Sequence, residues 1–285
     1  MNICNSTSWH RINADRNLNV VTRHLWFILN RLNNHFFQNI IDTNLMLREF
    51  RCLLDETDWS HFSHKTSPSR LLSDLFWLKL PWQAIQQELG KIKVYDIGCG
   101  KGKYGLMLQD LSGNRISSYT GIDVKYQDTW NELQVNRNNV TFITAHNTKA
   151  VITNIPTDIN LIISQSALEH IEEDLTLFKG IRDYITRTNR NIIQIHLIPS
   201  ESCLDLYRYH GVRQYSPRSL SKISKMFNHC SYSMLYKLGG QAGYDLHLEY
   251  ITYPIMKSGK DLREFQTENY YKLLKITTLK DMETP

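Results

Sequence analysis

The chain has 285 residues, enough for one large domain or for a standard domain with an added cap. With 41% hydrophobic and 21% charged residues, it has the composition of an ordinary folded protein, which excludes the disordered, collagenous and disulfide-scaffold classes. The formal net charge of +5 is modest and no run of five or six basic residues occurs, so we predict no nucleic-acid partner.

Cysteine usage and hydropathy indicate the compartment. The five cysteines form no CxxC pair, and one would stay unmatched if the other four were bridged, which favours reduced thiols in a cytosol. The N-terminus lacks a basic segment followed by a continuous apolar core, and no apolar stretch reaches the length of about 18 residues that spans a bilayer. We therefore predict a cytoplasmic protein without a secretory signal or a transmembrane segment.

Residues 1–90 are predicted to form a mostly helical extension that caps the rest of the chain. Apolar residues recur there at intervals of three and four, the spacing of one helix face, at Leu25, Ile28, Leu32, Phe36 and Ile40. Pro81 opens a further helix that Gly90 closes. The aromatic residues of this region are most simply core residues; in the alternative interpretation, Trp77 and Trp82 border an entrance for an acceptor.

After Gly90 the pattern changes to short apolar runs separated by helical patterns. Runs this continuous are typical of strands buried on both faces of a parallel sheet, and they lie at 92–98, 117–123, 140–145, 159–164 and 191–198. The segments 232–238 and 246–253 alternate around GGQAG and predict an antiparallel hairpin. Residues 91–285 are thus predicted to be an α/β domain, doubly wound, with a mostly parallel seven-stranded sheet that ends in a C-terminal hairpin.

A glycine-rich loop follows the first of these runs, in Asp96-Ile97-Gly98-Cys99-Gly100-Lys101-Gly102. Its alternate glycines let the backbone adopt conformations closed to other residues and let a ligand lie against the main chain. The loop is not a phosphate-binding Walker loop, because no GKS or GKT occurs. It is not a GxGxxG dinucleotide fingerprint either, because the third glycine falls one place early.

The remaining pattern, DxGxGxG, resembles motif I of the class I S-adenosylmethionine-dependent methyltransferases, which implies a Rossmann-like fold and that cofactor. In that family the acid and the glycine loop hold the aminocarboxypropyl group, here Asp96, Gly98, Gly100 and Gly102. A second acid at the end of the next strand holds the ribose hydroxyls, and Asp123, 21 positions after Gly102, matches it. Carboxylates suit a cofactor that carries sulfonium and ammonium cations.

The resemblance extends less clearly to the strands that follow. The family usually places an acid beside adenine after the third strand, but this chain has Ala145-His146-Asn147, so we predict that Asn147 contacts adenine through its amide. Ser164, at the end of the fourth strand, completes the predicted cofactor-binding set.

The segment Leu168-Glu169-His170 resembles the "LEH" segment of small-molecule O-methyltransferases. Small-RNA 2′-O-methyltransferases use an ExxEH pattern here to hold a divalent cation, but Ser166 replaces the first acid, so we predict no metal.

His210 lies in a loop before a helix that Ser216 and Pro217 are suited to start. We predict Glu169, His170 and His210 as catalytic residues, with the histidines as candidate bases. In the alternative interpretation all three are ordinary cap or loop residues, and His196 is a weaker candidate.

Together these patterns predict a methyltransferase that acts on an oxygen of a small metabolite, a sugar or a lipid-linked glycan intermediate. Two alternatives stay open: a cofactor-binding module without catalysis, and an RNA 2′-O-methyltransferase. The sequence leaves the acceptor and the oligomeric state undetermined.

Overall fold

A computed structural model describes residues 5–36, 42 and 45–283 of the chain. The chain divides into two compact units, one made of Met1–Leu45 and Pro81–Ser233, the other of Met46–Leu80 and Met234–Pro285. These units do not follow the predicted boundary at residue 90, because the segment 46–80 associates with the C-terminal part of the chain. Each unit is described below by itself.

The first unit contains a parallel sheet whose strands are the ones that the apolar runs predict. Among the described residues this sheet has five strands in the order β4-β3-β2-β5-β6, and it includes neither the hairpin nor the seven strands that the sequence predicts. From β2 the strands that follow in sequence, β3 and β4, lie on one side, and β5 and β6 lie on the other, so the direction of the connections changes between β2 and β5. Doubly wound folds share this feature, and their ligands bind at this point, outside the carboxyl ends of the strands. The strands are β2 (Ile92–Ile97), β3 (Ile116–Asp123), β4 (Val140–Thr144), β5 (Leu161–Gln165) and β6 (Ile193–Leu197).

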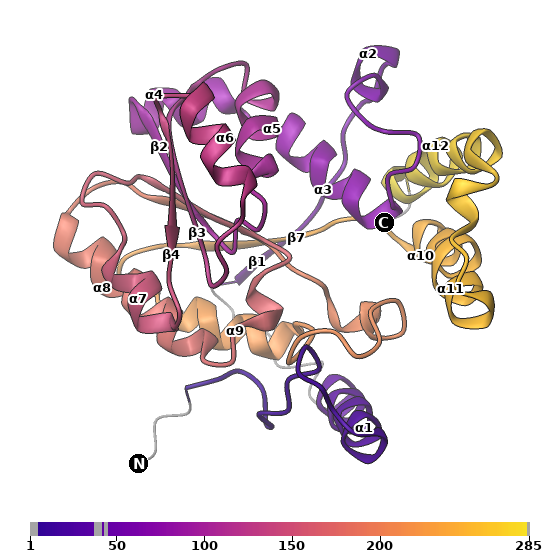
Figure 1. Cartoon of the computed structure of the whole chain (residues 1–285). Helices are drawn as coiled ribbons and strands as arrows, with labels where there is room; N and C mark the ends of the chain where they lie inside the picture. Colours follow the sequence, from indigo (N-terminus) through magenta and orange to yellow (C-terminus); the bar gives the residue numbers. More distant parts are fainter. Residues whose placement is uncertain (1–4, 37–41, 43–44, 284–285) are drawn as a thin grey trace. The chain divides into compact units, whose positions relative to one another are not determined.

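Helices accompany these strands in the first unit (Figure 1). They are α1 (Val20–Phe36), α4 (Trp82–Leu89), α5 (Lys103–Leu111), α6 (Thr129–Asn136), α7 (Thr148–Thr153), α8 (Asp174–Thr188) and α9 (Pro217–Lys225). Two predicted helix ends are confirmed. The Ser216 hydroxyl accepts a hydrogen bond from the backbone of Ser219 at 3.3 Å at the start of α9, and Gly90 ends α4 with φ of 70°.

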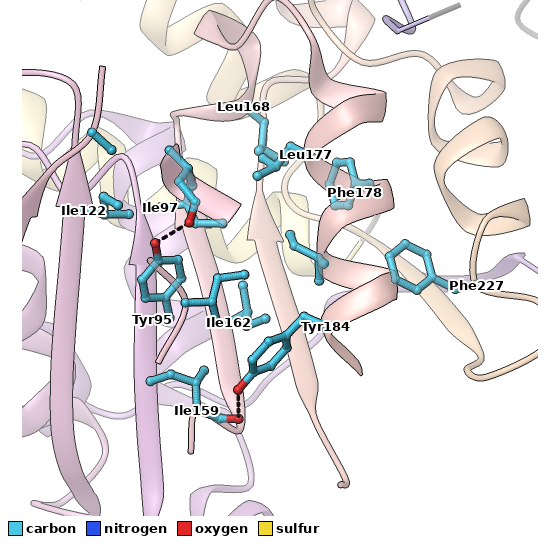
Figure 2. Packing of buried hydrophobic residues seen from close by; sticks show 14 of the residues in the cluster. Tyr95, Ile97, Ile122, Ile159, Ile162, Leu168, Leu177, Phe178, Tyr184 and Phe227 are labelled. Atoms are coloured by element: carbon cyan, nitrogen blue, oxygen red, sulfur yellow. Dashed lines mark hydrogen bonds between the residues drawn. The ribbon is translucent and has the colours of Figure 1, made fainter. Parts of the chain in front are cut away.

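One face of the sheet forms the main hydrophobic core with α7 and α8. Tyr95 and Ile162 of the sheet and Leu177 and Phe178 of α8 belong to this cluster, and Figure 2 shows these side chains lying together. The hydroxyl of Tyr95 donates to the carbonyl of Val151 at 2.6 Å, so its polar atom is satisfied inside the core. Because side chains alternate along a strand, Asp96 points away from the face that Tyr95 occupies.

On the opposite face, α5 packs closely on β3. A Cβ atom at Gly105 would lie 2.6 Å from the Tyr119 ring, so only glycine permits this approach. The Tyr119 hydroxyl in turn donates a hydrogen bond to the carboxylate of Asp96. The packing of α5 therefore fixes a residue of the predicted cofactor site.

The segment that forms α1 is helical as predicted, but the face of the helix that is buried is the opposite of the predicted one. Leu25, Ile28 and Leu32 of the apolar stripe are exposed, while Trp26 and Asn30 on the opposite face are buried. The indole of Trp26 donates a hydrogen bond to the backbone carbonyl of Gly211 at 3.1 Å. The side-chain amide of Asn30 donates one to the backbone carbonyl of Val212 at 3.2 Å. Ile40 and the side chain of Phe36 lie outside the described residues.

The second unit contains a two-stranded sheet, β1 (Leu45–Glu49) with β7 (Ser233–Lys237), and helices. The helices are α2 (Glu56–Trp59), α3 (Pro68–Leu78), α10 (Gln241–His247), α11 (Tyr253–Ser258) and α12 (Thr267–Glu283), with a π-helical turn at Leu248–Thr252. The predicted hairpin is therefore wrong: its first half is β7, which pairs with β1, and its second half is helical. The buried positions recur at the helical spacing of three and four, at Gly243, Leu246, His247, Tyr250 and Ile251.

Four aromatic residues of the N-terminal third are buried, as core residues are: Trp59, Phe76, Trp77 and Trp82. Trp77 and Trp82 therefore present no stacking face to an acceptor, and the interpretation of residues 1–90 as a cap gains no support from them. Within the described residues, no helix is both long and apolar enough to cross a membrane.

Candidate functional site

The glycine loop connects β2 to α5 in a left-handed path. Gly98, Gly100 and Gly102 have φ values of 77°, 52° and 75°, which side chains rarely adopt. A Cβ atom at Gly98 would lie 2.4 Å from the side chain of Ala167, and one at Gly102 would lie 2.4 Å from the ring of Phe142. These two glycines are thus required by packing within the unit.

Gly100 differs, because a Cβ atom there would meet nothing within 4 Å. Its backbone N–H donates to Asp123 Oδ2 at 2.9 Å, and its carbonyl accepts from the indole of Trp130 at 2.8 Å. Asp123 Oδ1 accepts from the backbone of Lys125 at 3.1 Å. Hydrogen bonds therefore hold the glycine loop against the Asp123 carboxylate at the end of β3, and the loop leaves open space at the Cβ position of Gly100.

Asp96, at the base of the loop, is a buried carboxyl group. Burial, opposed by the hydrogen bond from Tyr119 and aided by the negative charge of Asp123, raises its pKa to about 7. A bound cation would favour the ionised form of this group. Near neutral pH, Asp96 is therefore poised to change charge when a cationic ligand binds.

The two other residues predicted to bind the cofactor already have partners. Asn147 follows β4 and caps α7, since its side-chain oxygen accepts from the backbone of Ala150 at 2.8 Å. The hydroxyl of Ser164 is fully buried and lies 2.8 Å from His196 Nδ1 on the adjacent strand β6. A contact from Asn147 to a ligand would use its amide nitrogen, and Ser164 could take part only through its backbone.

Three of the predicted residues form a second cluster, after the ends of β5 and β6. Glu169 and His170 lie in the short 3₁₀ turn Leu168–His170, and His210 lies in the loop before α9. Glu169 Oε1 is 3.8 Å from His170 Nε2 and 3.9 Å from His210 Nε2, and the imidazole rings meet edge to face with centroids 4.5 Å apart. The structure thus brings together all three predicted catalytic side chains.

The electrostatics of this cluster follow from its burial. Glu169 is buried and its Oε2 atom has no hydrogen-bond partner among the described residues, so burial raises the pKa of this carboxyl group. Burial, together with the neighbouring His170, lowers the pKa of His210. His196, the weaker candidate base, is half-buried against Phe178, and desolvation lowers its pKa to about 4. Its Nδ1 atom is already paired with the Ser164 hydroxyl, which indicates a structural role.

The cluster includes an acid that the sequence analysis missed, Asp15 in the N-terminal segment. Asp15 Oδ2 lies 2.6 Å from His170 Nδ1, and its Oδ1 accepts from the backbone of Gly211 at 3.0 Å. Partial burial opposes ionisation of Asp15, but the hydrogen bonds from His170 and Gly211 outweigh it and lower the pKa. No local pattern marks Asp15, because its partners are distant in sequence.

A buried ion pair supports the turn that carries Glu169 and His170. Arg213 Nη1 lies 3.3 Å from Asp174 Oδ2 and donates to the carbonyl of Ile171 at 2.8 Å, and Nη2 donates to the hydroxyl of Ser6 at 2.9 Å. The backbone of Thr7 donates to Asp174 Oδ1 at 2.8 Å. The N-terminal segment is therefore part of the scaffold of this cluster.

Glu169, His170 and His210 are also the residues that could hold a metal ion, since one ligand atom of each lies within 4.8 Å of the others. This donor set, one carboxylate oxygen and two imidazole nitrogens, suits zinc or another transition metal better than Mg²⁺, which prefers oxygen. The prediction that no metal is needed is therefore a question for experiment.

The glycine loop and the histidine cluster lie at the same edge of the sheet. The strands are parallel, and both groups of residues follow their carboxyl ends. The packing of Ala167 against Gly98 connects the loop to the turn that precedes Glu169. The arrangement can hold a cation beside the carboxylates of Asp96 and Asp123, and the imidazoles nearby can accept a proton.

Comparison with known proteins found no matching family model and no matching curated protein. The solved structures that resemble the chain include a putative sarcosine dimethylglycine methyltransferase from Galdieria sulphuraria, with 16% identity and a TM-score of 0.45 over 75% of this chain and 78% of that one. Another is phosphoethanolamine N-methyltransferase 2 from Haemonchus contortus in complex with S-adenosyl-L-methionine, with 14% identity and a TM-score of 0.41 over 81% of this chain and 56% of that one.

A third is a SAM-dependent methyltransferase from Archaeoglobus fulgidus, with 16% identity and a TM-score of 0.36 over 60% of this chain and 73% of that one. At such identities and TM-scores these likenesses do not decide the reaction of this chain. The functional conclusion therefore depends on the site itself.

Proposed function

We propose that this chain is an S-adenosylmethionine-dependent methyltransferase that acts on an oxygen of a small metabolite, a sugar or a lipid-linked glycan intermediate. The observation that carries the proposal is the position of His170 and His210, around Glu169, at the sheet edge where the glycine loop and Asp123 lie. One half of the site suits the cofactor and the other suits an acceptor hydroxyl.

The cofactor half would use Asp96, the glycine loop and Asp123. The open position at Gly100 lets the aminocarboxypropyl group lie against the backbone. Asp96 would balance the ammonium cation, and the oriented carboxylate of Asp123 would accept from the ribose hydroxyls. The amide of Asn147 would contact adenine from the end of β4.

In the acceptor half, His170 would act as the general base through Nε2. The hydrogen bond between Asp15 and Nδ1 favours the tautomer with the proton on Nδ1, which leaves Nε2 free to accept one. When bound, the cofactor would supply an electrophilic methyl group for the acceptor oxygen, and His170 would accept the proton of the acceptor hydroxyl at Nε2. A base of this kind adds about 10² to 10⁴ in rate, and the rest comes from orientation.

Calorimetry with S-adenosylmethionine tests the cofactor half. Gly100→Ala adds a methyl group where the free protein has room, at a φ of 52° that strains a residue with a side chain. The variant should therefore fold with some loss of stability, and it should lose at least about tenfold in affinity because the methyl group blocks backbone approach. Gly90→Ala is the matched control, since Gly90 has a similar φ and an equally open Cβ position away from the loop. Equal affinity in both variants would refute the assignment.

Turnover with methyl-labelled cofactor separates the proposal from its alternatives. Cofactor binding without methyl transfer to any of a broad panel of hydroxylated metabolites, glycans and RNA would favour a binding module. Methyl transfer to an RNA 2′-hydroxyl alone would favour the RNA enzyme, and affinity for RNA would then fall steeply with salt. His170→Asn should lower turnover and leave cofactor affinity unchanged.

A further inference from the structure

The first two residues of α6 are hydrogen-bonded to the glycine loop. The indole of Trp130 donates to the carbonyl of Gly100 at 2.8 Å, and the hydroxyl of Thr129 donates to the carbonyl of Lys101 at 2.9 Å. Two neighbouring side chains of one helix therefore hold two successive carbonyl groups of the loop. This contact lies on the α6 side of the loop and uses none of the residues predicted from the sequence to bind the cofactor, apart from the carbonyl of Gly100.

Trp130 is itself held firmly in the unit. Only 2% of the residue is exposed, and its ring stacks on that of Phe142, with centroids 5.1 Å apart and an angle of 9° between the planes. The same phenyl ring occupies the space that a side chain at Gly102 would need. The backbone of Phe142 donates to Gln134 Oε1 at 2.8 Å, which fastens β4 to α6. The indole donor is therefore fixed in place before any ligand binds.

The two hydrogen bonds determine how the loop presents its backbone. In a planar trans peptide, the carbonyl of one residue and the N–H of the next point in opposite directions. Because the carbonyl of Gly100 points toward α6, the N–H of Lys101 points away from α6. Trp130 is almost fully buried, so it can affect a ligand only through this loop.

We infer that Trp130 and Thr129 are positioning residues that hold the glycine loop in the conformation that binds the cofactor. A segment with three glycines has many backbone conformations open to it, so contacts from outside the segment are needed to select one. If only a fraction of the molecules had the loop in that conformation, the apparent affinity would fall by the same fraction. The effect on affinity rests on the proposed function, whereas the effect on the loop does not.

Hydrogen–deuterium exchange of the full chain without cofactor tests the effect on the loop. Trp130→Phe keeps a ring to pack on Phe142 but lacks the indole N–H, so exchange in the loop should rise by about threefold to tenfold. Trp26→Phe is the matched control, because Trp26 is also a buried indole that donates to a glycine carbonyl, that of Gly211. It should leave the loop unchanged. The amides that report on the loop are the hydrogen-bonded ones of Gly98, Cys99, Gly100 and Gly102.

Calorimetry with S-adenosylmethionine tests the effect on binding. Trp130→Phe should bind about threefold to tenfold more weakly, and Trp26→Phe should bind like the unaltered protein. Thr129→Val removes the hydroxyl at nearly constant volume and should also weaken binding, whereas Thr129→Ser keeps the hydroxyl and should restore the affinity. The double variant Trp130→Phe/Thr129→Val should lose less than the product of the two single losses, because both residues hold the same loop.

Three results would overturn the inference. The first is unchanged exchange of the loop in Trp130→Phe, and the second is a rise spread equally over the whole unit, which would indicate a general loss of stability. The third is equal cofactor affinity in Thr129→Val and Thr129→Ser. If the loop exchanges faster in Trp130→Phe but the unaltered protein does not bind S-adenosylmethionine, the proposed function fails and the role of Trp130 in holding the loop is supported.

Discussion

The carboxylate of Asp15 lies 2.6 Å from Nδ1 of His170, although 155 positions separate the two residues along the chain. The other oxygen of Asp15 accepts from the backbone of Gly211, next to His210. One acid from the N-terminal segment thus connects the two loops that carry the candidate bases. In the proposed reaction Asp15 is a positioning residue, because it acts through His170.

We predict that Asp15→Asn lowers kcat by roughly tenfold to a hundredfold and leaves the cofactor Kd unchanged. The asparagine oxygen can still accept from Gly211, which preserves the loop, but the charge that stabilises a protonated His170 is lost. Steady-state kinetics at saturating cofactor, with calorimetry in parallel, measures both quantities. Asp205→Asn, which alters a surface ion pair with Arg208, is the control and should change neither. An equal loss of cofactor affinity would mean that Asp15 has only a structural role.

A second prediction concerns the buried pair between Arg213 and Asp174. Both side chains are almost fully buried, so Arg213→Met leaves an unpaired carboxylate inside the unit. We expect the free energy of unfolding to fall by about 3 to 5 kcal/mol. Arg208→Met removes an exposed pair and should change it by less than about 1 kcal/mol. Urea unfolding followed by tryptophan fluorescence measures the difference, and similar losses in the two variants would contradict the prediction.

The parts of the fold that the sequence predicts depend on local physical constraints. Strands buried on both faces need mainly apolar runs, which the central strands β2 and β5 show, whereas the edge strands β4 and β6 are only partly buried. A loop with three positive φ angles needs glycines at Gly98, Gly100 and Gly102. The Ser216-Pro217 helix start likewise requires only neighbouring residues. Each of these features can therefore be recognised within about ten residues of sequence.

The parts that the sequence does not predict depend on distant partners. The polar face of α1 is buried because backbone carbonyls at Gly211 and Val212 accept from Trp26 and Asn30, and periodicity alone assigns the opposite face to the core. Asp15 gains its role only through contact with His170.

Deletion of the whole N-terminal third would remove these contacts too, so it would not test separately whether residues 1–90 form a cap. Whether residues 1–90 cap the acceptor stays a prediction.

A third prediction is that Mg²⁺ is not required for methyl transfer. Glu169 supplies the only carboxylate among the three possible metal ligands, and Asp15 is engaged with the Nδ1 atom of His170. Exhaustive chelation should therefore leave turnover unchanged, and added Mg²⁺ should not increase it. Elemental analysis of the purified protein measures separately whether Glu169, His170 and His210 hold a transition metal. Loss of turnover on chelation with recovery on addition of Mg²⁺ or Zn²⁺ would show this prediction to be wrong.

The last prediction concerns pH and the buried carboxyl group of Asp96. Burial raises its pKa to about 7, so the folded protein holds a proton there that the unfolded chain releases near pH 4. The contribution of Asp96 to stability is therefore fully present below about pH 4 and is lost as the pH rises toward 7. Cofactor binding should show the opposite trend, because the ionised carboxylate attracts the cationic ligand.

We expect the affinity for S-adenosylmethionine to rise by roughly tenfold between about pH 6 and about pH 8 in calorimetric titrations. Asp96→Asn should bind the cofactor more weakly and lose most of this pH dependence. Titration of the cofactor itself affects both proteins equally, so it cancels when their affinities are compared at each pH. Tyr119→Phe removes the hydrogen bond that opposes the rise of the pKa, so it should move the midpoint to higher pH. If Asp96→Asn keeps the full pH dependence, another group is responsible and the role of Asp96 in binding the cation is refuted.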